Sequence, residues 1–272
     1  MPELPEVEIT IRSLRNKIIN QKITKIEVFY EPIVKSISIF QQLLHQTFYR
    51  CERKGKFLLF FCSNEWVLVG HLRMEGKIYL HSTSQCNHVQ DKHEHFRIFL
   101  DNNFVFRFYD FRKFARFNLY KEDNYLKESK LYQLALDPFS ISVETFYQKL
   151  QKSTSNIKQV LLNQKIISGI GNIYASEILF LSKIHPEVKA NILKLEKVQD
   201  LLNKTKKVLT KAIAAGGSSI STFEALGVKG NFQKQLLVYG KAKQKCSFCP
   251  KLIQNIKING RSSYFCDNCQ KL

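Results

Sequence analysis

Apolar residues recur with helical spacing at the start of the chain. Four of them lie three or four positions apart: Val7, Ile11, Leu14 and Ile18. This is the spacing of one face of an α-helix. Pro5 suits the first turn of such a helix, where its missing amide hydrogen costs nothing, and Glu6 and Glu8 favour the positive end of the helix. The pattern predicts a helix from Pro5 to about Ile19.

Short β-rich runs follow this helix. Seven segments are rich in β-branched and aromatic residues: Lys22–Tyr30, Phe57–Cys62, Trp66–His71, Lys77–His81, Phe96–Leu100, Phe104–Tyr109 and Ala115–Tyr120. Turn signals such as Ser63-Asn64 and Asp101-Asn102-Asn103 separate several of them. The region up to about residue 120 is therefore expected to form an antiparallel β-sandwich or barrel.

The pattern changes beyond Tyr120. Helical periodicity appears at about 143–151, 156–164, 173–183 and 191–214, and Pro138 and Pro186 interrupt it. The order of elements predicts an α+β fold, in which an N-terminal helix and β-sandwich precede a helical region. We expect three segments, namely 1–120, 121–230 and a final module at 231–272.

The final module carries metal-binding spacing. Four of the seven cysteines form a Cys-x2-Cys-x16-Cys-x2-Cys pattern: Cys246, Cys249, Cys266 and Cys269. Two such knuckles suit one tetrahedral Zn²⁺. A disulfide pair is the alternative, but a reducing compartment disfavours it. Cys51, Cys62 and Cys86 are scattered singly, and we expect them to be reduced thiols.

The chain is strongly basic. Lys and Arg number 42 against 23 Asp and Glu, which gives a formal net charge of +19. Such an excess indicates a polyanionic partner, and nucleic acid is the leading candidate because phosphate contacts dominate its affinity. A membrane surface is the alternative, but the sequence has no long uncharged apolar run. The N-terminus lacks the layout of a signal peptide, so we expect a cytosolic protein.

A glycine-containing turn offers groups for a phosphate. Asn156-Ile157-Lys158 begins one predicted helix, and Gly169-Ile170-Gly171-Asn172 precedes the next. With Asn172 at the N-cap, backbone N–H groups and a side-chain amide would face a phosphate. A purely structural turn is the alternative for this motif alone. The zinc module and the positive charge together favour nucleic-acid contact.

The first residues carry candidate chemistry. Removal of Met1 would leave Pro2 with a free secondary amine beside the carboxylate of Glu3. An α-amino group titrates near pH ~8, well below a lysine at ~10.4, so part of it is a nucleophile at neutral pH. Its attack on an aldehyde-level carbon gives an iminium, which is a good electron sink. A plain helix start is the alternative interpretation.

Four motifs stand in a fixed order along nearly the whole chain. They are Met1-Pro2-Glu3-Leu4-Pro5-Glu6-Val7-Glu8, Gly70-His71-Leu72-Arg73-Met74-Glu75-Gly76, Gly169-Ile170-Gly171-Asn172-Ile173-Tyr174-Ala175-Ser176-Glu177 and Gly260-Arg261-Ser262. Together they resemble the formamidopyrimidine-DNA glycosylase family. Leu4 points to this family rather than to its relative endonuclease VIII, whose start resembles Pro-Glu-Gly-Pro-Glu.

The resemblance implies a bifunctional base-excision repair enzyme. Such an enzyme removes oxidised purines, for example 8-oxoguanine and formamidopyrimidines, from double-stranded DNA and then cuts the strand by β,δ-elimination. Pro2 would form a Schiff base with the sugar, and Glu3 would protonate the sugar ring oxygen. Lys56 matches the lysine assigned to β-elimination, although a solvated strand-end lysine is the alternative. Arg261 matches the arginine assigned to δ-elimination, whose planar guanidinium suits a phosphate.

The resemblance also implies a helix-two-turn-helix region, a zinc-finger hairpin and a set of DNA contacts. Three residues match the wedge that fills the gap left by an extruded base: Met74, Arg112 and Phe114. Without the resemblance, a buried methionine and phenylalanine with a surface arginine would be the ordinary interpretation. His93, Lys158 and Asn172 match further DNA contacts. We expect a monomer whose one metal ion is structural and which needs no redox cofactor.

Two segments depart from the family pattern. Asp110-Phe111-Arg112-Lys113-Phe114-Ala115 stands where the family usually has Asp-Pro-Arg-Arg-Phe-Gly, and Ser221-Thr222-Phe223 stands where it tends to have Arg-Asp-Phe. The second departure falls in a loop, residues 217–231, expected to cover the flipped base, so it bears on lesion preference. Oxidised pyrimidines, as for endonuclease VIII, stay open as substrates. A non-catalytic zinc-dependent DNA-binding protein is the remaining alternative.

Overall fold

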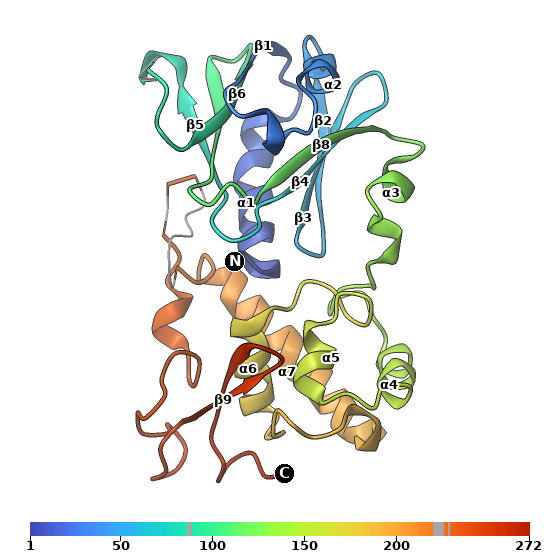
Figure 1. Ribbon diagram of the computed structural model, residues 1–272, viewed down its shortest axis with the longest axis vertical. Coiled ribbons are helices and arrows are strands. Elements are labelled where there is room, and N and C mark those ends of the chain that lie inside the picture. Colours follow the sequence, from blue (N-terminus) through green and yellow to red (C-terminus); the bar gives the residue numbers. More distant parts are fainter. Residues whose placement is uncertain (86–88, 220–225, 228) are drawn as a thin grey trace. The chain divides into compact units, whose positions relative to one another are not determined.

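The protein divides into two compact units in the computed structural model (Figure 1). The first unit contains residues 1–132 and 215–231, and the second contains residues 133–214 and 232–272. The segment after the longest helix therefore belongs with the N-terminal unit. The predicted boundaries after residues 120 and 230 remain a prediction.

The structure describes residues 1–85, 89–219, 226–227 and 229–272. Cys86 and the Ser221-Thr222-Phe223 segment lie outside the described residues.

The N-terminal helix forms as its apolar spacing predicts. Helix α1 (Leu4–Ile18) buries all four residues of the predicted face, and it lies against strands β2 and β3 of the first unit. Its start is closed by Glu6, whose Oε2 accepts a hydrogen bond from the backbone N–H of Glu3 at 2.8 Å. Such a bond satisfies one of the N–H groups that a helix start leaves unpaired.

Two antiparallel four-stranded sheets form the rest of the first unit. One sheet has the order β1-β6-β7-β5, with β1 Ile23–Val28, β5 Lys77–Ser82, β6 Glu94–Leu100 and β7 Phe104–Tyr109. The other has the order β2-β3-β4-β8, with β2 Phe48–Lys54, β3 Phe57–Cys62, β4 Trp66–His71 and β8 Arg116–Lys121. Their inward residues share one core with α1 and with Phe40, which lies outside the strands. The strand phenylalanines of this core are Phe48, Phe60, Phe96, Phe106, Phe108 and Phe117. Two short helices, α2 (Ile37–Phe40) and α3 (Tyr125–Glu128), accompany the sheets.

Strand β2 is absent from the sequence prediction. It lies at the edge of its sheet, and Tyr49 and Arg50 on it are exposed while Cys51 is buried. Polar residues on the outward face of an edge strand dilute the β-rich signal. By contrast, β3 is buried on both faces, because the ring of Phe61 packs against Tyr125 of α3 at 5.7 Å on the side away from the core. Its continuous apolar run is typical of such a strand.

The second unit is helical and ends in a hairpin. Its helices are α4 Val143–Gln151, α5 Ile157–Leu162, α6 Asn172–Leu181 and α7 Leu195–Ala214, and its strands are β9 Gln254–Ile258 and β10 Arg261–Phe265. Helix α6 is buried along most of its length. Its Glu177 carboxylate accepts hydrogen bonds from the backbone N–H groups of Leu237, Val238 and Tyr239. These bonds attach residues 237–239, which precede the hairpin in the chain, to helix α6 at the centre of the unit.

A tight turn joins β9 to β10. Asn259 and Gly260 both have positive φ, at 47° and 72°. This is the backbone of a type I′ turn, whose twist suits two-residue hairpins and which favours Asn-Gly. The turn places Arg261 at the start of β10. The predicted fold class is thereby confirmed, with an N-terminal helix and antiparallel sandwich followed by a helical region and a C-terminal hairpin.

Within the described ranges, no helix combines the length and the apolar character needed to cross a membrane.

Candidate active site

The N-terminal amine lies in a partly buried, charged environment of the first unit. Pro2 and Glu3 are buried, while Met1 remains accessible. The Met1 amine stands here for the amine that Pro2 would carry after processing. Burial lowers its pKa below the ordinary 8.0, although the carboxylates of Glu3 and Glu6 oppose this. The charges of Lys56 and Glu75 also act on it. An amine with a lowered pKa is a better nucleophile at neutral pH.

Lys56 is buried rather than solvated. It follows Gly55, whose φ of 58° makes the turn between β2 and β3, and only 6% of Lys56 is exposed. Its neighbour His71 is also buried. Burial, with the positive charges of Arg73 and Lys56, lowers the pKa of His71 to about 3. His71 is therefore neutral at physiological pH, and the solvated-lysine alternative for Lys56 does not fit its burial.

Glu6 joins the N-terminus to a distant segment of the same unit. Its Oε2 accepts from Glu3 N–H, and its Oε1 accepts from Ser218 N–H at 2.8 Å. Gly217 has a φ of 77°, and a Cβ atom there would lie 3.0 Å from Glu6 Oε1. Glycine at this position therefore allows both the left-handed backbone and the close approach. From the sequence, Glu6 was assigned only to the positive end of the helix, because a partner 212 residues away leaves no local signal.

The predicted wedge residues project from two turns. Met74 is 40% exposed and Phe114 is 49% exposed, and the Arg112 guanidinium lies 4.8 Å from the Phe114 ring centroid. Buried Asp110 shapes one turn by accepting hydrogen bonds from the backbone N–H groups of Arg112 and Ala115. Large apolar side chains held in solvent are available to enter a base stack. The alternative of a buried methionine and phenylalanine is therefore wrong.

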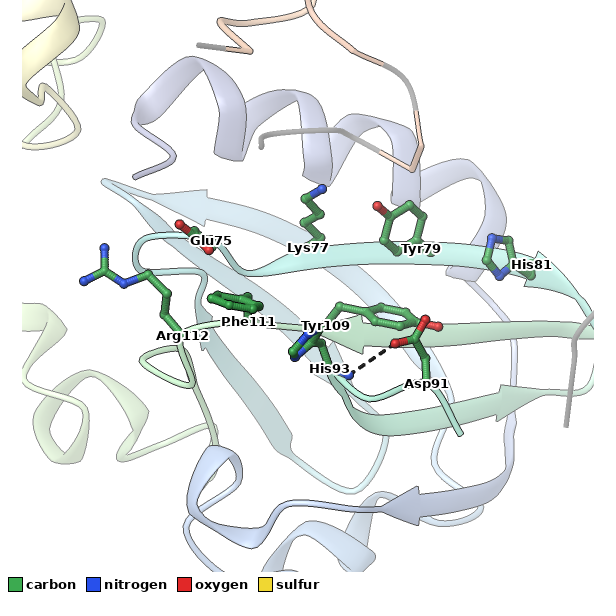
Figure 2. Close-up of a pocket in the computed structure, with 9 residues that line it drawn as sticks. All are labelled: Glu75, Lys77, Tyr79, His81, Asp91, His93, Tyr109, Phe111 and Arg112. Atoms are coloured by element: carbon green, nitrogen blue, oxygen red, sulfur yellow. Dashed lines mark hydrogen bonds between the residues drawn. The ribbon is translucent and has the colours of Figure 1, made fainter. Parts of the chain in front are cut away.

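A cavity of about 840 Å³ opens on the outer face of the β1-β6-β7-β5 sheet (Figure 2). Tyr79 and Tyr109 meet edge to face at 5.3 Å on its wall, and the ring of His93 meets Phe111 at 4.7 Å. Glu75 also lines the cavity, and its charge acts on the N-terminal amine. Aromatic faces with a few charged groups suit a planar, polar ring. Tyr79 and Tyr109 are not among the residues predicted from the sequence, and their outward alternation on the strands was the available signal.

In the second unit, Lys158 is the most deeply buried of the candidate cations. It is 1% exposed, and its Nζ donates to Asn172 O at 3.2 Å and to Ser176 Oγ at 2.7 Å. The Asn172 Nδ2 donates to Ser262 O at 2.9 Å, next to exposed Arg261. The structure thus brings the turn before α6 and the start of β10 together. Within the described part of the chain, the buried Oδ1 of Asn172 makes no hydrogen bond.

The prediction that Asn172 is the N-cap of its helix is wrong. Gly171 occupies that position with extended backbone, and the helix begins at Asn172. The shift by one residue frees the Asn172 side chain to reach Ser262 of the hairpin.

The four clustered cysteines fit a zinc ion. The Sγ atoms of Cys246, Cys249, Cys266 and Cys269 all lie within 4.8 Å of one another, and all four are free thiols. Four thiolates around one point match the tetrahedral coordination of structural Zn²⁺. The donor set supports one structural zinc, and the disulfide alternative does not fit the free thiols.

Comparison with known proteins gives three matches along the chain. The model of the formamidopyrimidine-DNA glycosylase N-terminal domain matches residues 1–117, and that of the H2TH domain of the same family matches residues 134–224. A model described as a zinc finger found in FPG and IleRS matches residues 243–272. The chain belongs to the formamidopyrimidine-DNA glycosylase family.

Relatives in this family align over the full chain. A formamidopyrimidine-DNA glycosylase of Mycoplasma mobile is 40% identical over 279 residues, which cover 100% of both chains. The Lactococcus lactis subsp. lactis protein of the same name is 41% identical over 278 residues, also with 100% coverage of both. The structure of Lactococcus lactis Fpg with an abasic site containing DNA has a TM-score of 0.92 and 38% identity, and it covers 99% of this chain and 100% of that one.

Proposed function

We propose that the protein is a bifunctional DNA glycosylase and AP lyase that excises oxidised purines during base excision repair. The observation that carries the proposal is the partly desolvated N-terminal amine, which is surrounded by Glu3, Glu6 and Lys56 in a formamidopyrimidine-DNA glycosylase chain. The structures of the Lactococcus lactis relative with Fapy-dG containing DNA support the purine class of lesion.

The reaction would begin at Pro2. After Met1 is removed, the Pro2 nitrogen attacks C1′ of the lesion sugar, and the bond between C1′ and the base breaks with its electron pair leaving on the base. The Pro2 nitrogen loses its proton, Glu3 protonates the sugar ring oxygen, the ring opens, and an iminium joins C1′ to Pro2. The iminium acidifies the adjacent C2′–H and so prepares the strand for cleavage.

Strand cleavage would follow by two eliminations. Loss of the C2′ proton expels the 3′ phosphate in the β-elimination, for which Lys56 is the assigned residue. A further proton loss expels the 5′ phosphate in the δ-elimination, assigned to Arg261. Zn²⁺ bound by the four cysteines would hold the hairpin that carries Arg261. Its part is structural, and no bond of the substrate is broken at the metal.

DNA contacts would come from both units. Met74, Arg112 and Phe114 would fill the gap left by the extruded nucleotide, and their exposure supports this role. His93, Lys158 and Asn172 would supply further DNA contacts. The cavity beside Glu75, with its aromatic walls, would accept the base. We further propose that the protein is cytosolic and acts on duplex DNA as a monomer. Sedimentation at several protein concentrations would test the monomeric state.

Borohydride trapping tests the proposal directly. Borohydride reduces an iminium to a stable amine, so incubation with a duplex that carries 8-oxoguanine should yield a covalent protein–DNA product. An extra residue before Pro2 turns the amine into an amide and should abolish the product, whereas Pro5→Ala, a change of proline in the same helix start, should retain it. Tight binding of the duplex without any trapped product would contradict the proposal.

A matched pair of substrates tests the lesion class. Single-turnover excision is measured on duplexes that differ only in an oxidised purine or an oxidised pyrimidine. We expect faster excision of the purine. Faster excision of the pyrimidine would keep the mechanism and overturn the assigned substrate.

A further inference from the structure

Two buried arginines face each other on the outer side of the sheet that carries the cavity. Arg97 of β6 pairs directly with Arg107 of β7, and both are buried. Like charges placed directly opposite one another destabilise a sheet, and burial raises that cost. The pairing is therefore sustained by a counter-charge on the same face.

Glu94 supplies this counter-charge through an irregularity in the strand. The register of β6 against β7 shifts between Glu94 and Phe96, and such bulges re-aim side chains. The Glu94 carboxylate accepts from Nε and Nη2 of Arg97 at 2.7 and 2.6 Å, and from Nε and Nη2 of Arg107 at 2.5 and 2.6 Å. Burial alone would raise the pKa of Glu94, but the bonds from both arginines hold it below its usual value. Glu94, Arg97 and Arg107 are called the Glu94 cluster below.

The Glu94 cluster also holds an exposed segment outside the sheet. Arg97 Nη2 donates to the carbonyl of Val89 at 3.1 Å, although Val89 itself is exposed. The backbone N–H of Asp91 reaches Glu94 Oε2 at 3.4 Å, and the N–H of Glu94 donates back to Asp91 O at 3.1 Å. Residues 89–93 are thus fastened to the buried carboxylate at several points.

This segment places His93 on the wall of the cavity. His93 N–H donates to Asp91 Oδ1 at 3.2 Å, and Figure 2 shows both side chains on the cavity wall. The His93 carbonyl accepts from the N–H of Asp110, the residue that shapes the Arg112 turn. Arg97 Nη1 also pairs with Glu27 Oε2 of β1 at 3.4 Å, within the sheet, whereas its bond to the Val89 carbonyl reaches the exposed segment. Its effect is to fix the segment before a ligand arrives, which lowers the entropy cost of binding.

We propose that the Glu94 cluster is a positioning device that holds His93 ready to contact the DNA strand. The inference rests on the proposed function, because it takes His93 as a DNA contact. Arg97, Arg107 and Glu94 are positioning residues that act through the 89–93 segment and do not themselves touch DNA.

A double-mutant cycle on DNA binding tests this role. Affinity is measured by fluorescence for a labelled duplex that carries a tetrahydrofuran abasic analogue, with the wild type, Arg97→Met, His93→Ala and the double variant. Arg97→Met leaves Glu94 paired with Arg107. We expect each single variant to bind about tenfold more weakly, the effect of one hydrogen bond to a charged group. The double variant should match His93→Ala within about twofold, since one variant removes what the other positions.

Arg50→Met is the matched control. It removes the same charge from an exposed pair with Glu122 in the same unit, and its effect should multiply with that of His93→Ala. A double Arg97→Met/His93→Ala variant about a hundredfold weaker than wild type would show independent effects and overturn the inference. So would a His93→Ala or an Arg97→Met variant that binds as wild type does.

Amide hydrogen exchange tests whether the Glu94 cluster orders the 89–93 segment. In Arg97→Met, the N–H groups of Asp91, His93 and Glu94 should lose protection, while those of β9 and β10 keep theirs. If Arg97→Met folds poorly, Arg97→Lys takes its place. This variant retains the charge without the planar guanidinium, and it should show the same loss of protection. Unchanged protection at 91–94 in both variants would contradict the proposal. Borohydride trapping decides the proposed function and the binding cycle decides the cluster, so the two can fail separately.

Discussion

Replacing Glu6 by glutamine removes a buried carboxylate that accepts two backbone N–H groups. Both hydrogen bonds are 2.8 Å long, one from Glu3 and one from Ser218. A glutamine has one acceptor oxygen, so one N–H meets the amide nitrogen and loses its partner. An unsatisfied buried donor costs about 1–3 kcal/mol, and the retained bond loses its charge assistance, about 1 kcal/mol more. We therefore expect the free energy of unfolding of the first unit to fall by roughly 2–4 kcal/mol.

Thermal unfolding followed by circular dichroism measures this change. For a unit of about 150 residues, each kcal/mol lowers Tm by about 2–4 °C, so the transition of the first unit should move down by roughly 5–15 °C. Glu8→Gln is the control on the same helix. Glu8 pairs with Arg12 and Arg53 at 2.7 and 2.9 Å, but 19% of its side chain is exposed. Its replacement should therefore cost about 1 kcal/mol or less.

Equal decreases of Tm in Glu6→Gln and Glu8→Gln would contradict the assigned role of the Glu6 carboxylate as a buried acceptor of two N–H groups. Gly217→Ala probes the same contact from the other side, because its Cβ would press on Glu6 Oε1 and its φ of 77° strains alanine. A left-handed conformation alone costs about 1–2 kcal/mol for a residue with a Cβ. Gly217→Ala should therefore destabilise the first unit as well, and a neutral effect would contradict the described approach of the two segments.

Three further predictions concern other parts of the molecule. His71 is held neutral with a pKa of about 3, so the stability that depends on its neutral form is complete above the unfolded pKa near 6.5 and is lost as pH falls toward 3. Between pH 6 and 4, the free energy of unfolding measured in urea should therefore fall by about 1.4 kcal/mol less per pH unit in His71→Phe than in wild type. Metal analysis should find about one zinc per chain, and Cys266→Ser should lose both the metal and the amide protection of the hairpin. Phe114→Ala should leave Tm unchanged while weakening binding to an abasic duplex, whereas buried Phe108→Ala should cost about 3–5 kcal/mol; equal loss of Tm in both would contradict the wedge.

Local patterns predicted the elements whose signals are local. The buried face of α1 is read from spacing alone, and all four predicted residues are buried. The clustered cysteines needed only their intervals, because two knuckles constrain one ion. Edge strand β2 was not predicted because its outward residues are polar. The predicted N-cap at Asn172 was wrong because Gly171 takes the extended backbone that an N-cap needs.

Long-range partners could not be predicted in the same way. Glu94 reads as an ordinary strand residue until the register shift turns it toward Arg97 and Arg107. Register depends on how two strands pair, which no single segment specifies. The link from Glu6 to Ser218 has the same character. The family resemblance named Lys56 and Lys158, but their deep burial follows from tertiary packing.

The contact between Glu6 and Ser218 also limits how early in biosynthesis the N-terminal region can complete its folding. Its partners are 212 residues apart, so the N-terminus cannot be closed until most of the chain has left the ribosome. At about 5–20 residues per second, this leaves roughly 10–40 s in which the nascent end is open to an aminopeptidase. Once the unit folds, Pro2 and Glu3 are buried. Because Met1 itself stays accessible while Pro2 is buried, we expect excision of the initiator methionine, on which the proposed nucleophile depends, to be faster on the nascent chain than on the folded protein.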